Sequence, residues 1–119
     1  MNTTEVAAKL VQYCREGKNV DAINELYADN IISREPKGSH YELVEGKQAV
    51  LDKNLQWYNM VQEVHSAAIS DPIVTGNFFA VTMDMDVTYK EHGRVSMQEI
   101  AIYEVKDGKI ITDQFFYNM

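Results

Sequence analysis

Residues 78–90, with the sequence FFAVTMDMDVTYK, alternate between apolar and polar side chains over a full strand length. Successive side chains of a β-strand point to opposite faces of its sheet. The apolar face of this segment consists of Phe79, Val81, Met83, Met85, Val87 and Tyr89. The other face carries Thr82, Asp84, Asp86 and Thr88. A strand with one buried and one hydrated face is typical of an antiparallel sheet.

The segments that follow extend this strand into a meander. Residues 91–93 (EHG) predict a hairpin turn, and residues 94–105 predict the next strand. The Asp107–Gly108 pair is typical of a tight hairpin, so residues 110–117 are expected to form a last antiparallel strand.

Upstream of the meander, the pattern is extended but interrupted. Gly76–Asn77 predicts a turn, and residues 63–75 predict a strand that breaks at Asp71–Pro72, because proline cannot donate to a sheet ladder. Residues 31–34 predict a short strand that ends at Glu35–Pro36, followed by a polar loop over residues 37–45.

The first half of the chain is mainly helical. Asn2 and Glu5 have the spacing of a capping box, and apolar residues then recur at helical spacing as far as Gly17. Asn19 predicts the start of a second helix that ends around residues 28–30, and residues 47–60 predict a third. Helices followed by strands predict an α+β fold, which we assign to one domain over residues 1–119.

Composition and charge narrow the function classes. The 119 residues are 45% apolar and 24% charged, and 11 Lys and Arg against 18 Asp and Glu give a net charge of −7. This charge disfavours binding to nucleic acid and to an anionic membrane. Cys14 is alone, no apolar run approaches the length of a membrane span, and the first ten residues lack a signal-peptide pattern. We therefore expect a cytoplasmic protein.

Four stretches together resemble the SnoaL-like proteins of the nuclear transport factor 2-like superfamily. They are Leu26–Asn30, Glu35–Pro36, Gly46–Ala49 and Ile102–Ile110, and the resemblance covers nearly the whole chain. It implies a cone-shaped curved antiparallel sheet with three N-terminal-half helices packed on its concave side. It also implies a ligand pocket inside the cone and a homodimer formed through the outer sheet face. The polar face of residues 82–88 is either that dimer surface or a hydrated surface.

The resemblance does not select one function, because this fold carries isomerases, cyclases, dehydratases and non-catalytic binding domains. One hypothesis is a protein that holds a small, mostly apolar organic ligand in the cone and performs cofactor-free acid–base chemistry. The alternative is a non-catalytic dimeric binding or protein-interaction module.

Glu35 and Glu99 are the first candidates for proton transfer. By the resemblance to ketosteroid isomerase-like proteins, the position of the carboxylate base falls on Glu35. Its alternative role is a loop residue paired with Arg34 or Lys37. Glu99 shares its predicted strand face with apolar residues, and burial there would raise its pKa and make it a general acid. Its alternative role is a partly hydrated or structurally paired carboxylate.

Two further acid–base positions of these families fall on residues without an acidic side chain. The second carboxyl position of the isomerases falls on Ala101, and the acid–base position of SnoaL-like cyclases falls on Phe115. Asp113 lies nearby, and we expect it to be hydrated or paired with a helix. His65 is either a proton-transfer partner of Glu35 or Glu99, or a buried structural histidine.

The expected ligand-binding residues are mostly apolar or aromatic. They are Tyr13, Trp57, Met83, Tyr103 and Phe115, and each is alternatively a core residue. The phenol of Tyr13 or a protonated Glu99 would stabilise an oxyanion formed when Glu35 takes a proton next to a carbonyl. The sequence contains no phosphate-binding loop or paired-cysteine motif, and we expect neither a cofactor nor a metal site.

Overall fold

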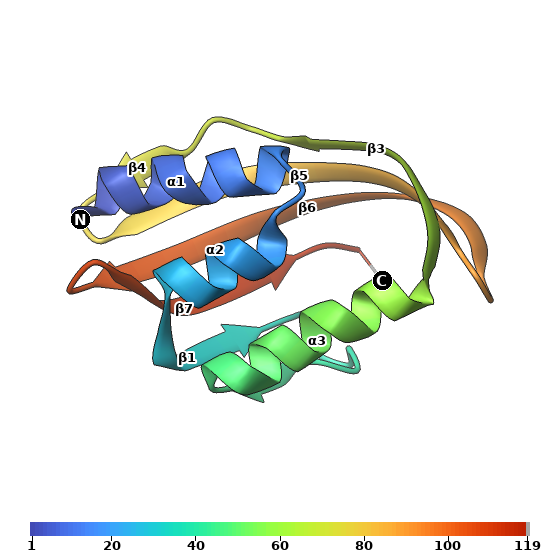
Figure 1. Ribbon diagram of the computed structural model, residues 1–119, viewed down its shortest axis with the longest axis horizontal. Coiled ribbons are helices and arrows are strands. Elements are labelled where there is room, and N and C mark those ends of the chain that lie inside the picture. Colours follow the sequence, from blue (N-terminus) through green and yellow to red (C-terminus); the bar gives the residue numbers. More distant parts are fainter. Residues whose placement is uncertain (119) are drawn as a thin grey trace.

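The computed structural model describes residues 1–118, which form three helices and seven strands. Their order is α1 (Thr3–Arg15), α2 (Asn19–Leu26), β1 (Tyr27–Arg34), β2 (Leu43–Glu45), α3 (Lys47–Met60), β3 (Val61–Ile69), β4 (Ile73–Thr75), β5 (Phe78–Tyr89), β6 (Gly93–Lys106) and β7 (Lys109–Phe116). The predicted order of helices and strands is confirmed (Figure 1). No helix among these residues is both long and apolar enough to cross a membrane.

The strands form a single sheet in the order β2-β1-β7-β6-β5-β3, with β4 also paired to β5. Every neighbouring pair is antiparallel except β1 and β7, which run parallel. The sheet is therefore mixed at this one pair. Residues 78–89 and 93–104 pair without a break, which confirms the strand and the hairpin turn predicted from the alternation.

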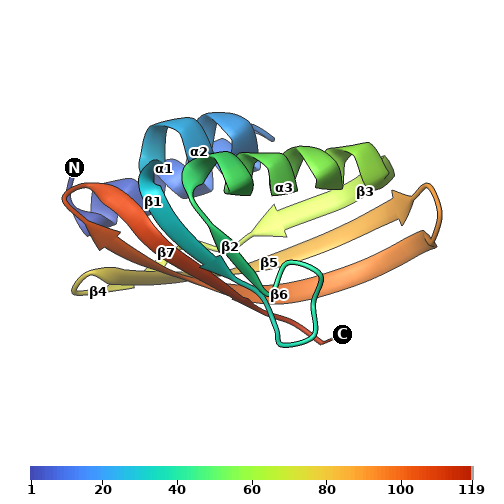
Figure 2. The ribbon, with the colours of Figure 1, turned by 90° about the horizontal axis from the view of Figure 1, so that it is seen from below.

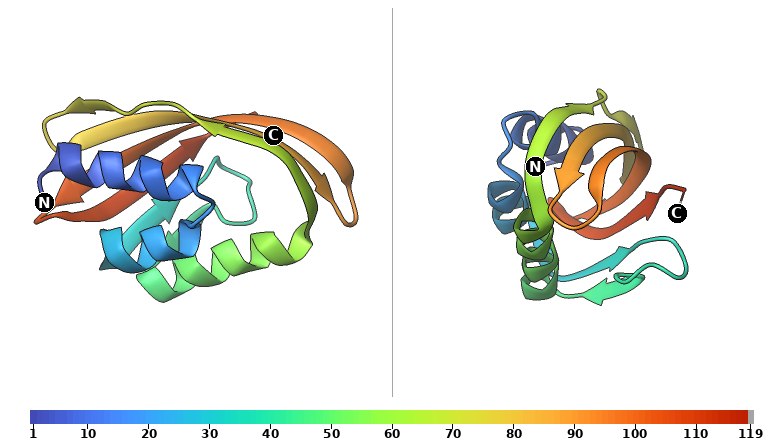
Figure 3. Two further views of the ribbon diagram at one scale, coloured as in Figure 1. Left: turned by 45° about the horizontal axis from the view of Figure 1, so that its top comes forward. Right: turned by 90° about the vertical axis from the view of Figure 1, so that its right-hand side faces the viewer.

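The sheet bends around the helices without closing (Figure 2). All three helices lie on its concave side, and the far end of the β5–β6 hairpin extends beyond them (Figure 3). The α+β class with helices on the concave face of a curved sheet is thus confirmed. The helices do not cover this face completely. Side chains of the sheet beneath α3 remain half-exposed.

The core lies where α1 and α2 cover the sheet. Leu26 and Ile31 are fully buried, and Phe79 and Tyr103 are exposed by only 1% and 2%. These two rings are register partners on β5 and β6 and stack with their centroids 4.6 Å apart. The apolar face predicted from residues 78–90 therefore packs into this core at its first half.

Two boundaries differ from the sequence prediction. Helix α2 ends at Leu26, before residues 28–30, because Tyr27 adopts an extended conformation and begins β1. Asn19 is its first helical residue, and the N-cap position belongs to Lys18. The predicted polar loop contains β2, whose three residues pair with residues 32–34. Three residues are too few to show a periodic pattern in sequence.

The capping box at α1 is confirmed and gives a test of local stability. Asn2 Oδ1 accepts a hydrogen bond from Glu5 N at 2.8 Å, and the Glu5 carboxylate accepts from Asn2 N at 3.0 Å. We expect Asn2→Ala to lower the free energy of unfolding by about 1 kcal/mol in urea titration. Thr4→Ala, at an exposed position of the same turn, should change it by less than about 0.5 kcal/mol. Equal losses in both variants would contradict the capping role.

Candidate functional site

Lys53 connects α3 to the concave face of the sheet. Its Nζ lies 2.9 Å from Glu35 Oε2 and donates to Ser33 Oγ at 3.2 Å. The side chains of Lys53 and Glu35 are only 15% and 17% exposed. The same ammonium group lies 5.2 Å from the centroid of the Phe115 ring, within the range of a cation–π interaction. The ion pair is therefore partly shielded from water. Charges in such a shielded place attract each other more strongly than charges at the surface.

Glu35 is held by donors on both of its oxygens. Tyr117 donates its hydroxyl to Oε1, while Lys53 donates to Oε2. The extended backbone before Pro36 projects Glu35 two residues beyond Ser33, so both side chains lie on the same face of β1. The alternative in which Glu35 pairs with Arg34 or Lys37 is not formed. Hydrogen bonding to Glu35 and burial raise the pKa of Tyr117 to about 12, with burial the larger cause.

Glu99 is the carboxyl group whose protonation changes near neutral pH. It pairs with Met83 across β5 and belongs to the concave face of β6, together with Met97 and Ala101. Burial raises its pKa to about 7, and the negative charge of Glu35 adds to this effect. Lys53 opposes the shift, and Asp113 adds a smaller contribution in the raising direction. Glu99 can therefore give or take a proton at physiological pH.

Asp113 is buried, so the expectation of a hydrated or helix-paired residue is wrong. Only 2% of it is exposed, and its Oδ2 accepts a hydrogen bond from Tyr27 at 3.0 Å. Its Oδ1 is buried without a partner among residues 1–118. Burial raises the pKa of its carboxyl. Asp113 is buried because the strand register places it opposite Tyr103 on β6 and Ser33 on β1.

Three connected side chains, two aromatic and one thioether, line the concave face at the end of α3 farthest from α1 and α2. Trp57 of α3 donates its indole N–H to Tyr89 at 3.1 Å, and the Tyr89 hydroxyl lies 3.4 Å from the sulfur of Met97. Met83 packs against the core beside Glu99. Of the expected ligand-binding residues, Met83 lies opposite Glu99 and Phe115 lies at Lys53, Trp57 lies at the far end of the concave face, and Tyr103 is part of the buried core.

His65 and Tyr13 do not join this site. His65 lies on the convex side of the sheet, where Nδ1 is 3.0 Å from Glu63 and Nε2 is 2.6 Å from Thr88 Oγ1. Its predicted pairing with Glu35 or Glu99 is therefore wrong, because the register shift between Val61 and Glu63 places Glu63 opposite Thr88, and His65, two residues later, lies on the same side. Tyr13 donates to Glu25 of α2 at 2.7 Å and contacts neither Glu35 nor Glu99.

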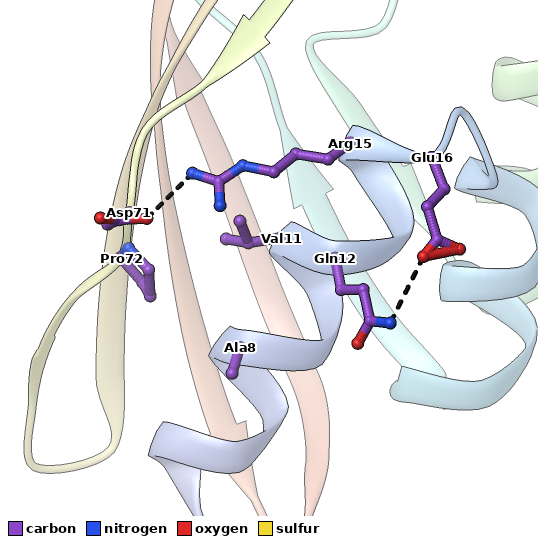
Figure 4. A pocket seen from close by; sticks show the side chains of 7 residues that line it. All are labelled: Ala8, Val11, Gln12, Arg15, Glu16, Asp71 and Pro72. Atoms are coloured by element: carbon purple, nitrogen blue, oxygen red, sulfur yellow. Dashed lines mark hydrogen bonds and ion pairs between the residues drawn. The ribbon is translucent and has the colours of Figure 1, made fainter.

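Two surface grooves lie outside the concave centre. One, of about 300 Å³, lies between α1 and the link from β3 to β4, where Arg15 binds Asp71 at 2.9 Å (Figure 4). The other, of about 450 Å³, lies between β2 and α3 and includes Lys53 in its wall. Lys53 thus connects the second groove with the carboxyl groups of the concave face. Among residues 1–118, no three His, Cys, Asp or Glu side chains are placed to hold a metal ion.

The comparison with known proteins identifies the family. The SnoaL-like domain matches residues 1–117. The chain belongs to the SnoaL-like family. No curated protein matches this SnoaL-like chain at a significant level. A proposed SnoaL-like polyketide cyclase from Mesorhizobium loti is 35% identical, with a TM-score of 0.93 over 98% of this chain and 100% of that one.

More distant structures share the fold of this SnoaL-like protein. A proposed isomerase from Bacillus subtilis is 24% identical, with a TM-score of 0.74 over 99% of this chain and 90% of that one. An NTF2-like protein from Burkholderia pseudomallei is 14% identical, with a TM-score of 0.79 over 99% and 92% of the two chains. These structures confirm the predicted nuclear transport factor 2-like fold.

Sequence reasoning missed Lys53, Tyr117 and Asp113 as members of this site. Lys53 and Tyr117 are 18 and 82 positions from Glu35, so no local pattern links them. A partial signal existed for Lys53, which interrupts the otherwise apolar face of residues 50–61.

The raised pKa of Glu99 predicts a dependence of stability on pH. Between the ordinary value of 4.5 and about 7, the folded protein binds more protons at Glu99 than the unfolded chain does. Its stability should therefore fall as pH rises through this interval. Relative to wild type, Glu99→Gln should gain about 1–2 kcal/mol between pH 4.5 and pH 8, a value reduced for solvent screening. Urea titration at both pH values measures it.

Glu104→Gln is the matched control, because Glu104 lies on the same strand but on the convex face. Its stability should follow that of wild type at both pH values. A Glu99→Gln variant that also follows wild type would show that Glu99 keeps its ordinary pKa in the folded protein.

Proposed function

We propose that this protein binds a small organic carbonyl compound on the concave face and moves a proton on it without a cofactor. The observation that carries this proposal is the position of Glu99, a half-buried carboxyl group among apolar side chains on the concave face, where burial raises its pKa to about 7 and Lys53 opposes the shift. When the pKa of a group is close to the working pH, much of the group is in its basic form and that form is still a strong enough base to take a proton. This balance is optimal for proton transfer.

The proposed reaction is an isomerisation in which Glu99 both takes and returns the proton. The Glu99 carboxylate removes a proton from the carbon next to the carbonyl, and the electron pair of the C–H bond moves to form an enolate. The ammonium group of Lys53 stabilises the negative charge on the enolate oxygen. When the substrate carries a carbon–carbon double bond next to that carbon, the enolate is conjugated with it. The protonated Glu99 then delivers the proton to the far carbon of that double bond, the double bond shifts into conjugation with the re-formed carbonyl, and the product has the composition of the substrate.

In this mechanism Glu35 positions the donor groups. Both of its oxygens already accept hydrogen bonds, from Lys53 and from Tyr117, and this arrangement fixes the two donors toward the concave face. This assignment moves the role of base from Glu35 to Glu99. It also replaces Tyr13, whose hydroxyl is bound to Glu25, with Lys53 as the group that stabilises the oxyanion.

Family membership supports the same reaction class. The relative from Mesorhizobium loti is named for polyketide cyclisation, and the fold neighbour from Bacillus subtilis is named as an isomerase. Enolate formation is a step that both classes of reaction share. The half-exposed Trp57, Met83 and Phe115 supply apolar contact for the carbon skeleton of the ligand.

The loss of proton exchange in Glu99→Gln tests this function. Cyclohexanone in deuterated buffer is the probe, and NMR follows the exchange of its α-protons. We expect wild-type exchange to rise with pH through about 7 and Glu99→Gln to lose about 10²–10⁴-fold of it. Glu104→Gln should retain wild-type exchange, and unchanged circular dichroism in both variants controls for folding. Exchange that survives in Glu99→Gln, or is absent from wild type, would refute the proposed chemistry.

A homodimer through the convex face is a second part of the proposal. Ile100 and Phe116 are register partners on this face and are 47% and 46% exposed, and Ile102 lies beside them. Burial of such a patch against the same patch of a second copy forms a closed two-fold dimer. A dimer of this kind is compatible with catalysis and with the alternative of a binding module.

Sedimentation of an Ile102→Lys variant checks the dimer. A charge introduced into a self-complementary apolar interface faces its own copy, so we expect wild type to sediment as a dimer and Ile102→Lys as a monomer. Leu55→Lys is the control, because Leu55 is equally apolar and 49% exposed but lies on α3. A wild type that sediments as a monomer would contradict the proposed interface.

A further inference from the structure

The amide of Asn54 is a polar group that α3 buries without satisfying. Its Oδ1 has no hydrogen-bond partner among residues 1–118, although it is shielded from solvent. A buried carbonyl oxygen without a donor costs about 1–3 kcal/mol. Neither the fold nor the proton-transfer mechanism accounts for this side chain, since an apolar residue at this position would pack without that cost.

Helical spacing places Asn54 over the concave face. Val50 lies one turn before it and is buried in the core, and Trp57 lies one turn after it and donates to Tyr89 on β5. Residues at i, i+4 and i+7 of a helix share one face. The adjacent Lys53 reaches Ser33 and Glu35 on β1. Asn54 therefore lies between the contacts of α3 with β1 and its contact with β5. The two strands between β1 and β5 in the sheet are β7, which carries Phe115, and β6, which carries Glu99.

The concave face offers more acceptors than donors to a ligand. Asp113 Oδ1 on β7 is a second buried oxygen without a partner among the described residues, and Asp113 is only 2% exposed. Lys53 and Tyr117 already donate to Glu35 and Trp57 already donates to Tyr89, while Asn54 Oδ1 is itself an acceptor. A ligand that satisfies Asn54 must therefore bring its own hydrogen-bond donor.

We propose that Asn54 selects a carbonyl compound that also carries a hydroxyl group, which donates to Asn54 Oδ1 when the carbonyl lies beside Lys53. This inference rests on the proposed function and names its substrate class as a hydroxylated ketone. Asn54 determines specificity, and the proton transfer itself remains with Glu99.

Three probes of similar size separate the possible preferences. Cyclohexanone lacks a second polar group, 4-hydroxycyclohexanone can donate, and 4-methoxycyclohexanone can only accept. Chemical-shift titration of the wild-type protein measures each affinity. We expect the hydroxyl compound to bind about tenfold more tightly than the other two, because an unpaired buried acceptor gains a donor in that complex alone. Tighter binding of the methoxy compound would overturn the proposal, since it would mean that the site offers a donor.

Asn54→Leu tests the residue. The variant should lose the preference for the hydroxyl compound, bind cyclohexanone as wild type does, and melt at the same or a higher temperature, because the buried unpaired amide is gone. Asn59→Leu is the matched control, since Asn59 is exposed on the same helix. A preference that survives in Asn54→Leu, or that Asn59→Leu also abolishes, would overturn the assignment to Asn54.

The two proposals fail separately in these measurements. A hydroxyl preference without deuterium exchange leaves the role of Asn54 intact and refutes the proton transfer. Exchange without a hydroxyl preference refutes the role of Asn54 alone. If none of the three ketones shifts resonances of the concave face, the assignment of Asn54 is overturned together with the ligand site.

Discussion

The ion pair between Lys53 and Glu35 is the interaction on which the candidate site depends. It joins the middle of α3 to the end of β1, and it supplies positive charge to a region that contains the carboxyl groups of Glu35, Glu99 and Asp113. Lys53 holds the pKa of Glu99 and of Asp113 lower than burial alone would leave them. One positive charge does not neutralise three carboxylates, so a raised pKa is the expected electrostatic consequence.

The curved sheet makes this gathering possible. Glu35 directly follows β1, Asp113 lies on β7 and Glu99 lies on β6; these three strands are consecutive in the sheet, and the three side chains share the concave face. The end of the concave face under α1 and α2 is buried, whereas side chains at the end near Trp57 remain half-exposed. The same layer of side chains is therefore a packed core at Phe79 and Tyr103 and a polar, accessible surface at Glu99.

Three buried side-chain oxygens have no hydrogen-bond partner among residues 1–118. Most buried polar groups in proteins have hydrogen-bond partners, so oxygens without one need an explanation. Two of the three, Asn54 Oδ1 and Asp113 Oδ1, belong to side chains of the concave layer on α3 and β7. The third, Glu25 Oε2 on α2, forms an ion pair with Lys9. Polar groups placed to meet a ligand cost stability in its absence, which is a common feature of functional sites.

The sequence alone determined the order of the elements. The alternation of residues 78–90, the Asp107–Gly108 turn and the Asn2–Glu5 capping box depend on interactions within a few residues, and each was found where local chemistry predicted it. The sequence also singled out Glu99 as a carboxyl group on an apolar strand face, and the family resemblance singled out Glu35.

Only the tertiary structure decided which of these residues meet. The register shift between Val61 and Glu63 placed His65 on the convex side, the register of β7 buried Asp113, and the parallel pairing of β1 with β7 brought Ser33 beside Asp113. The partnership of Glu35 with Lys53 and Tyr117 depends on packing between segments up to 82 residues apart. Burial and charge, which set the pKa of Glu99, are properties of that packing and have no counterpart in the local sequence.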